Sequence, residues 1–197
     1  AALLLSGDYN RGWEEYEWRS KKKDPTLPSA HPKCSCWDGM TTELDSQLLL
    51  ISEQGLGDTL QFMRYVIALR NQGIAVTLCA QPKLHSLIKS SGIDSSPLTP
   101  TQANEFSKGH WSPLLSVPRY LQVCPDNPII TEPYIKTTNE LTCKWKDILS
   151  AEQRPIIGIN WQGNPKAETA NLKGRSLPLA TFAVITEQTN ASLLSLQ

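Results

Sequence analysis

The sequence lacks an excess of charge of either sign, because lysine plus arginine and aspartate plus glutamate both number 19 among its 197 residues. A formal net charge of zero gives no electrostatic reason to expect nucleic acid or a membrane surface as a partner. The chain also lacks an apolar run of about 20 residues, the length that a membrane-spanning helix needs. We therefore expect no nucleic-acid partner and no transmembrane segment.

Paired metal-binding cysteines are missing as well. The five cysteines are scattered, and the Cys34-x-Cys36 pair has no second pair at a spacing typical of zinc sites. No carboxylate cluster suggests a metal either. An odd number of dispersed cysteines favours reduced thiols in a cytosolic protein. The apolar stretch 1–5 lacks the basic flank and cleavage pattern of a signal peptide. We therefore predict a cytoplasmic protein without a metal site.

The chain begins without methionine in what reads as a helix and stops in what reads as a strand, so we interpret it as a fragment of a longer protein. A helical hairpin at the start carries Trp13, Tyr16 and Glu17 at spacings i, i+3 and i+4, which suits the last unit of a helical repeat array. An ordinary N-terminal hairpin is the alternative. The following stretch, up to residue 43, contains a lysine run and several prolines and reads as a linker.

From residue 44 onward, apolar strands alternate with amphipathic helices, which predicts a parallel sheet with right-handed crossovers. The expected strands are 48–52, 74–79, 94–98, 111–115, 156–161 and 192–196; the expected helices are 59–71, 82–91, 138–149 and 179–189; and 100–109 reads as a polar loop. The predicted domains are a helical hairpin (1–19), a linker (20–43), a Rossmann-like domain (44–136), a bridging helix (137–154) and the truncated start of a second Rossmann-like domain (155–197).

The most informative segment runs from Leu48 to Phe62 and reads as a buried strand, a glycine turn and a helix that opens on Asp58. Ligands of open α/β sheets bind at the carboxyl edge of the strands, where this turn lies. Gly55 and Gly57 allow a sharp turn and a close approach of the backbone to a ligand. Asp58 is suited to take a proton from a hydroxyl nucleophile. Its alternative role is that of a helix N-cap, and the two roles are compatible.

Two neighbours of this turn, Glu53 and Gln54, are candidates to hold sugar hydroxyls, or they satisfy backbone groups. A dinucleotide-binding site is a further alternative, because Gly55 and Gly57 match the start of the G-x-G-x-x-G motif. The third glycine of that motif is replaced by Leu60. The second strand ends in Cys-Ala-Gln, without the ribose-binding acid that the motif requires. Both departures count against NAD.

A second loop follows a buried strand at residues 161–178 and contains Asn164, Lys173 and Arg175 just before a helix. Guanidinium and free N–H groups at a helix start form a good cradle for a diphosphate. A solvated basic loop is the alternative. Among the histidines, His110 is expected near the ligand edge of the first sheet and is a weak site candidate.

Several segments resemble bacterial proteins in which tetratricopeptide repeats precede a C-terminal glycosyltransferase domain. GDYNRGWEEYEWR resembles the last repeat of these proteins, CWDGM their linker motif and LLLISEQGLGDTLQFMRY their first strand, loop and helix. SPLLSVPRYL and IGINWQGNPKAETANLKGRSLPLATF resemble later signatures. The resemblance covers most of the chain, and its EQGLGDTLQF element is specific.

These domains are similar to the heptosyltransferase-like glycosyltransferases, which resemble glycosyltransferase family 9 and have the GT-B fold. The resemblance implies an α/β protein of two Rossmann-like domains with the active site in the cleft between them. It implies that Asp58, which matches the aspartate of the Gly-Asp motif, is the catalytic base. It also implies that Arg175 contacts donor phosphates, although leucine stands where the family has tryptophan.

The resulting hypothesis is a cytoplasmic, inverting, metal-independent glycosyltransferase tethered to a repeat array. Its donor is a nucleotide-diphosphate sugar, without a separate cofactor, and its acceptor is a glycan, a lipid-linked sugar or a protein. Gly55, Gly57, Gln54, Asn164, Lys173 and Arg175 are the expected donor- and acceptor-binding residues. The fragment alone is expected to be inactive.

Two other function classes stay open. One is a non-catalytic scaffold whose helical repeats bind a protein partner. The other is a nucleotide-binding oxidoreductase, which predicts NAD binding.

Overall fold

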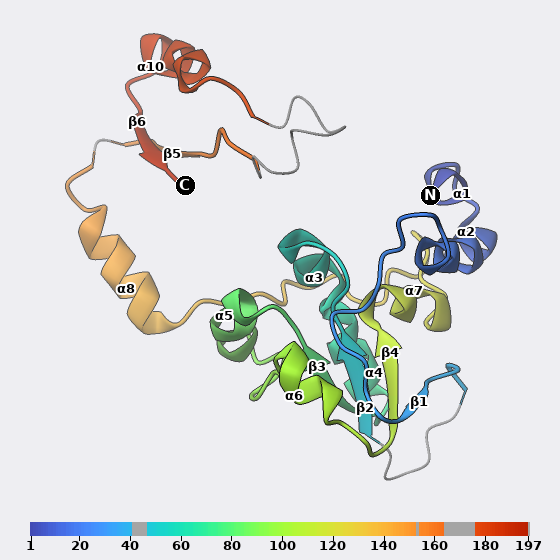
Figure 1. Ribbon diagram of the computed structural model, residues 1–197. Helices are drawn as coiled ribbons and strands as arrows, with labels where there is room; N and C mark the ends of the chain where they lie inside the picture. Colours follow the sequence, from blue (N-terminus) through green and yellow to red (C-terminus); the bar gives the residue numbers. More distant parts are fainter. Residues whose placement is uncertain (41–46, 153, 164–175, 197) are drawn as a thin grey trace. The chain divides into compact units, whose positions relative to one another are not determined.

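The computed structural model describes residues 1–40, 47–152, 154–163 and 176–196 of the chain (Figure 1). The chain divides into two compact units, Ala1–Thr138 and Asn139–Gln197.

The first unit is built around a parallel sheet of four strands in the order β1-β4-β2-β3 (Figure 1). Its central strand consists of Leu48, Leu49, Leu50 and Ile51 after one exposed glutamine, and these four side chains are at most 3% exposed. An unbroken apolar run is what a strand buried on both faces of a sheet requires. The strands are β1 (Ser35–Cys36), β2 (Gln47–Ile51), β3 (Ala75–Cys79) and β4 (His110–Pro113).

The two faces of this sheet are covered differently. Leu48 and Leu50 point into the main core, which they share with side chains of helices α3 (Leu56–Phe62) and α4 (Arg64–Asn71). On the opposite face Leu49 packs in a smaller cluster with Ala30 of the linker and Ala103 of α6 (Pro100–Asn104). The linker therefore covers part of a sheet face that a crossover helix covers in most α/β proteins.

The predicted helix 59–71 exists but begins earlier and is divided at Met63 into α3 and α4. Gly73 ends it as predicted, with φ +85°. The Gly73 N–H donates to the Arg70 carbonyl and the Ile74 N–H to the Leu69 carbonyl, which is the hydrogen-bond pattern of a Schellman motif. The next helical segment also matches its predicted range, as η2 (Pro82–Leu84) and α5 (His85–Ser90).

Two predictions for the following stretch are wrong. Residues 94–98 do not form a strand, and only Leu98 makes an isolated parallel bridge, to Cys79. The Asp94 carboxylate accepts the N–H groups of Leu78 and Ser96, so a side chain takes the place of strand pairing there. Residues 100–109 are not all loop, because Thr99 caps the helix α6 through a reciprocal contact with Gln102.

The N-terminal hairpin packs against the α/β part of the first unit. Trp13 meets Phe62 edge to face, and its indole N–H donates to the Val123 carbonyl at 2.6 Å. Asp8 caps the second helix by accepting the Arg11 N–H. The hairpin consists of α1 (Ala2–Leu5), α2 (Tyr9–Tyr16) and the 3₁₀ turn η1 (Glu17–Ser20), and it faces η3 (Leu114–Ser116) and α7 (Val117–Tyr120).

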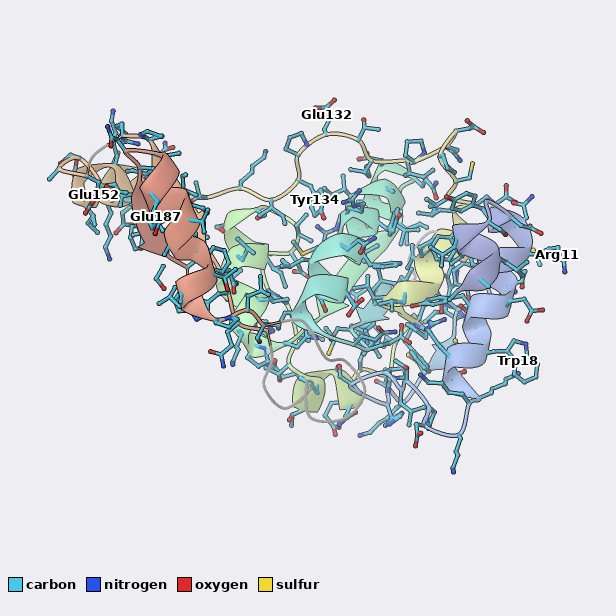
Figure 2. All side chains as sticks on the ribbon, turned by 90° about the horizontal axis from the view of Figure 1, so that it is seen from above. Arg11, Trp18, Glu132, Tyr134, Glu152 and Glu187 are labelled. Atoms are coloured by element: carbon cyan, nitrogen blue, oxygen red, sulfur yellow. The ribbon has the colours of Figure 1, made fainter. Side chains whose placement is uncertain are left out.

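After α7 an irregular segment returns along the helices of the main core. Tyr134, which is labelled in Figure 2, anchors it: the phenol donates to the Leu60 carbonyl at 2.6 Å, and the Arg64 guanidinium lies over the ring.

The second unit contains a parallel pair of strands with a helical segment between them in sequence. An apolar hollow of about 540 Å³ lies among its side chains, including Trp161, Phe182 and Leu193. Its predicted helices and strands are present at nearly the predicted bounds. They are α8 (Asn139–Ile148), β5 (Ile156–Ile159), η4 (Leu179–Phe182), α10 (Ala183–Gln188) and β6 (Ser192–Ser195).

Candidate functional site

The strand order of the first unit defines where a ligand is expected. The strand β2 has β3 on one side and β4 on the other, so the order in which the chain adds strands reverses between β2 and β4. Open α/β sheets bind ligands at such a switch point, outside the carboxyl ends of the strands. Residues 52–55 follow β2 at this edge, and η3 follows β4.

Asp58 lies at this edge as the third residue of α3, and its carboxylate Oδ2 accepts the Gly55 N–H at 3.0 Å. The alternative prediction that Asp58 is the N-cap is therefore wrong, because Gly55 is the N-cap residue and Asp58 is the third residue of the helix. A carboxylate at the third helical position satisfies an N–H group that the helix itself leaves unpaired. Among the described residues, the second oxygen, Oδ1, accepts no hydrogen bond.

The two glycines of the turn are not there for an unusual backbone conformation. Gly55 has φ −70°, which any residue adopts, and Gly57 is not among the glycines with positive φ. The turn is therefore made without the positive φ that only glycine adopts readily. A Cβ built on Gly57 meets no atom within 4 Å, so open space lies beside this residue. Close approach of a ligand to the backbone stays a prediction.

Gln54 is held at the same edge by its backbone. Its carbonyl accepts the amide N–H of Gln81 at 2.9 Å, and the Gln81 amide oxygen in turn accepts the Thr59 hydroxyl at 2.9 Å. The Gln54 side-chain amide lies 3.4 Å from the Tyr16 hydroxyl. Gln81 stands where a dinucleotide-binding fold carries its ribose-binding acid, and its amide is engaged by the protein's own loop.

Glu53 spans the switch point. Its Oε2 accepts the Leu115 N–H at 3.0 Å, which ties the end of β2 to the segment after β4. Both of its oxygens also accept N–H groups of Arg19, each at 3.1 Å. The Glu53 side chain is 1% exposed and that of Arg19 is 7% exposed. Of the two roles predicted for Glu53, the structure provides the one that satisfies backbone groups.

The pKa values of Glu53 and Arg19 are both affected by the burial of this ion pair. Burial raises the pKa of the Glu53 carboxyl, while Arg19 and the Leu115 N–H act in the opposite direction. Burial lowers the pKa of the Arg19 guanidinium, but the hydrogen bonds and charges of Glu53 and Glu17 outweigh it and leave the pKa raised. Sequence reasoning missed Arg19, because nothing in the local pattern shows that a side chain at the end of the hairpin reaches a loop 34 positions away.

His110 is not at the ligand edge. It is the first residue of β4 and pairs in register with Leu48, near the amino end of β2. Parallel strands have all their amino ends at one edge of the sheet, so the prediction for His110 is wrong. Another histidine, His85, has its ring nitrogen Nε2 at 3.0 Å from the Ala80 carbonyl oxygen.

The remaining predicted site residues, Asn164, Lys173 and Arg175, lie outside the described residues. The two ends of their loop meet: the Ser176 hydroxyl accepts the Gly163 N–H at 3.0 Å, and the Trp161 carbonyl accepts the Leu177 N–H at 2.8 Å.

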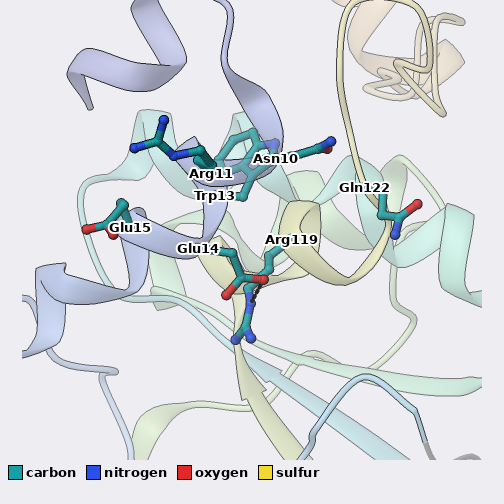
Figure 3. A pocket seen from close by; sticks show the side chains of 7 residues that line it. All are labelled: Asn10, Arg11, Trp13, Glu14, Glu15, Arg119 and Gln122. Carbon is teal, nitrogen blue, oxygen red and sulfur yellow. Dashed lines mark hydrogen bonds and ion pairs between the residues drawn. The ribbon is translucent and has the colours of Figure 1, made fainter.

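A pocket of about 340 Å³, whose lining residues do not include Asp58, lies between α2 and the turn after α7 (Figure 3). Trp13 lies at its back, and the Arg119 guanidinium donates to the Glu14 carboxylate at 2.8 Å across it. Of the other lining residues, Arg11 and Glu15 add charges of opposite sign, and Asn10 and Gln122 are neutral amides. Such a balanced set selects no charge class of ligand.

These observations define a mixed α/β protein with a parallel four-stranded sheet, compatible with a Rossmann-like fold. Comparisons with models of protein families, with curated proteins and with solved structures found no match to this chain. Within the described ranges, no helix combines the length and the apolar character needed to cross a membrane. The same ranges contain no group of three or more histidine, cysteine, aspartate or glutamate side chains placed to hold a metal ion.

Proposed function

We propose that this chain belongs to a glycosyltransferase that moves a sugar from a nucleotide-diphosphate donor to a hydroxyl acceptor, with Asp58 as the general base. One observation supports the proposal most strongly. The Asp58 carboxylate lies at the carboxyl edge of the first sheet with one oxygen bonded to the Gly55 N–H and the other without a hydrogen bond among the described residues. A base held in this way has a fixed orientation and a free lone pair.

The proposed reaction is a direct displacement. The acceptor hydroxyl gives its proton to Asp58 Oδ1 as its oxygen forms a bond to the anomeric carbon of the donor. The bond between that carbon and the phosphate oxygen breaks, and the nucleoside diphosphate leaves with the electron pair. Attack from the face opposite the leaving group inverts the anomeric centre. General-base catalysis of this kind contributes about 10²- to 10⁴-fold in rate.

The leaving diphosphate needs positive charge, and the proposal assigns this role to Lys173 and Arg175, with Asn164 as a polar contact. Guanidinium groups bind phosphate oxygens through paired N–H donors. Stabilisation of charge that develops on a leaving group is an electrostatic contribution to catalysis. The proposed acceptor is a glycan, a lipid-linked sugar or a protein hydroxyl.

The experiment is a calorimetric titration of the full-length protein with a panel of nucleotide-diphosphate sugars, followed by an assay for release of the nucleoside diphosphate. We expect one nucleotide class to bind and Arg175→Ala to weaken that binding at least tenfold. NAD serves as the comparison ligand and is expected not to bind. If no nucleotide sugar binds at millimolar concentration, or if only NAD does, the proposed function is wrong.

A further inference from the structure

We propose that Arg19 is a positioning residue for Asp58. Arg19 fixes Glu53 and thereby the loop of residues 52–55, from which α3 starts. This inference deepens the proposed function and rests on it for its effect on turnover. Arg19 belongs to η1, at the end of the N-terminal hairpin, and acts through Glu53 rather than on the reacting atoms.

All five N–H donors of the Arg19 guanidinium are used. Two of them form the paired contact with the Glu53 carboxylate. Two more go to the hairpin itself, to the Glu17 carboxylate at 2.7 Å and the Tyr16 carbonyl at 3.2 Å. The fifth goes to the Ser116 hydroxyl at 2.7 Å, which in turn donates to Glu17 at 2.9 Å. A planar group with every donor engaged has a single orientation, so the plane of the Glu53 carboxylate is fixed as well.

The connection from Glu53 to Asp58 is short. Only residues 52–55 separate the end of β2 from the first residue of α3. Gly55, two positions after Glu53, supplies the N–H that holds Asp58 Oδ2. A rotation of the buried Glu53 side chain out of its contact with Arg19 therefore moves the peptide that orients the proposed base.

Hydrogen bonds hold the loop from the sides of both neighbouring strands, and Arg19 donates those to Glu53 on one side. On the side of β3, the Gln81 amide donates to the Gln54 carbonyl at 2.9 Å. On the side of β4, Glu53 accepts from Arg19 and from the Leu115 N–H. The first of these contacts comes from within the α/β part of the unit, whereas Arg19 comes from the hairpin. The hairpin is thus built into the site rather than attached beside it.

Lysine cannot replace arginine in this arrangement. An ammonium group keeps the charge but lacks the planar fork that engages both carboxylate oxygens while also reaching three other acceptors. Arg19→Lys therefore separates the positioning role from the charge. Arg119→Lys is a matched control, because Arg119 also donates to a glutamate, Glu14, but makes no contact with the loop.

The experiment compares the unchanged full-length protein with these two variants by thermal unfolding, by amide signals in NMR and by steady-state kinetics with the donor found in the binding panel. We expect Arg19→Lys to be folded, to shift the amide signals of Gly55 and Leu115, and to lower kcat about 10- to 100-fold with little change in the KM of the donor. Arg119→Lys is expected to leave these signals and kcat unchanged. A folded Arg19→Lys protein with unchanged Gly55 and Leu115 signals overturns the proposal.

Two further results keep the test decisive. If the unchanged protein transfers no sugar, the proposed function fails, but the amide signals still decide whether Arg19 orients the loop. If Arg19→Lys does not fold, hydrogen exchange in the unchanged protein decides. We expect the Gly55 amide to be measurably protected from exchange, although less than the Leu115 amide, because Gly55 is exposed and Leu115 is buried. Free exchange of Gly55 beside a protected Leu115 overturns the proposal.

Discussion

The indole N–H of Trp13 donates to the backbone carbonyl of Val123 at 2.6 Å, although the two residues are 110 positions apart. The same ring meets Phe62 edge to face, with centroids 6.5 Å apart. One tryptophan thus joins the N-terminal hairpin to α3 and to the turn after α7. Its polar atom is hydrogen-bonded where its apolar body packs, as is usual for a tryptophan that is at least partly buried.

Trp13→Phe is expected to destabilise the protein by about 1–2 kcal/mol, because it keeps an aromatic ring but removes the hydrogen bond to Val123. Urea unfolding measures this change. Trp18→Phe is the control, since the Trp18 side chain is 60% exposed, and it is expected to change the free energy of unfolding by less than about 0.5 kcal/mol. Equal effects of the two substitutions would show that Trp13 does not anchor the hairpin.

Arg19→Met is expected to cost about 3–5 kcal/mol, because it leaves the Glu53 carboxylate buried without its partner. The double variant Arg19→Met with Glu53→Gln should recover a large part of that loss, since no unpaired charge stays buried. Arg119→Met, which breaks a partly exposed pair, should cost at most about 1 kcal/mol. Equilibrium denaturation checks all three values, and equal costs for Arg19→Met and Arg119→Met contradict the account.

Gly109 and Gly73 have nearly the same backbone conformation, with φ +82° and +85°, but different surroundings. A Cβ on Gly109 collides with the Gln47 carbonyl at the start of β2, whereas a Cβ on Gly73 meets nothing within 4 Å. Gly73→Ala should therefore cost only the conformational penalty of about 1–2 kcal/mol. Gly109→Ala should cost at least about 1 kcal/mol more, because a backbone must shift. Similar melting temperatures for the two variants contradict this.

Cys79 is buried on β3, and burial raises the pKa of its thiol to about 11 from 9.0. In the unfolded chain the thiol ionises first, so the stability that the protonated form provides is complete below pH 9. It is lost as the pH rises from 9 to 11. The expected slope is about 1.4 kcal/mol per pH unit. The Cys79→Ala protein should lack this loss of stability between pH 9 and 11. If both proteins lose stability equally between pH 9 and 11, the thiol is not buried as described.

Sequence reasoning succeeded where the local pattern decides the structure. The unbroken apolar run at Leu48–Ile51 predicted a buried strand, and Gly73 marked a helix end, because both signals depend on a few neighbouring residues. It failed at residues 94–98, which were expected to form a strand in the alternation of strands and helices, because the Asp94 carboxylate takes the place of strand pairing there. It also failed at His110, which lies at the amino end of β4 rather than at the ligand edge.

The candidate site was predictable only in part. The strand, loop and helix around Asp58 follow from a local motif, so the position of this carboxylate at the sheet edge was found. The pairing of Arg19 with Glu53 was not predicted, because it depends on how the hairpin packs. A linker separates the two residues in sequence. The β1 strand within that linker was missed for the same reason, since its pairing with β4 is a long-range contact.

The most direct test of the account is the turnover of Asp58→Asn in the full-length protein. Asparagine can still accept the Gly55 N–H, so the fold and the donor affinity should be retained. We predict that kcat falls about 10²- to 10⁴-fold, because the amide cannot take the acceptor proton. Asp24→Asn, on the exposed linker, should leave kcat unchanged. A folded Asp58→Asn protein that transfers sugar at the unchanged rate would contradict the role of Asp58.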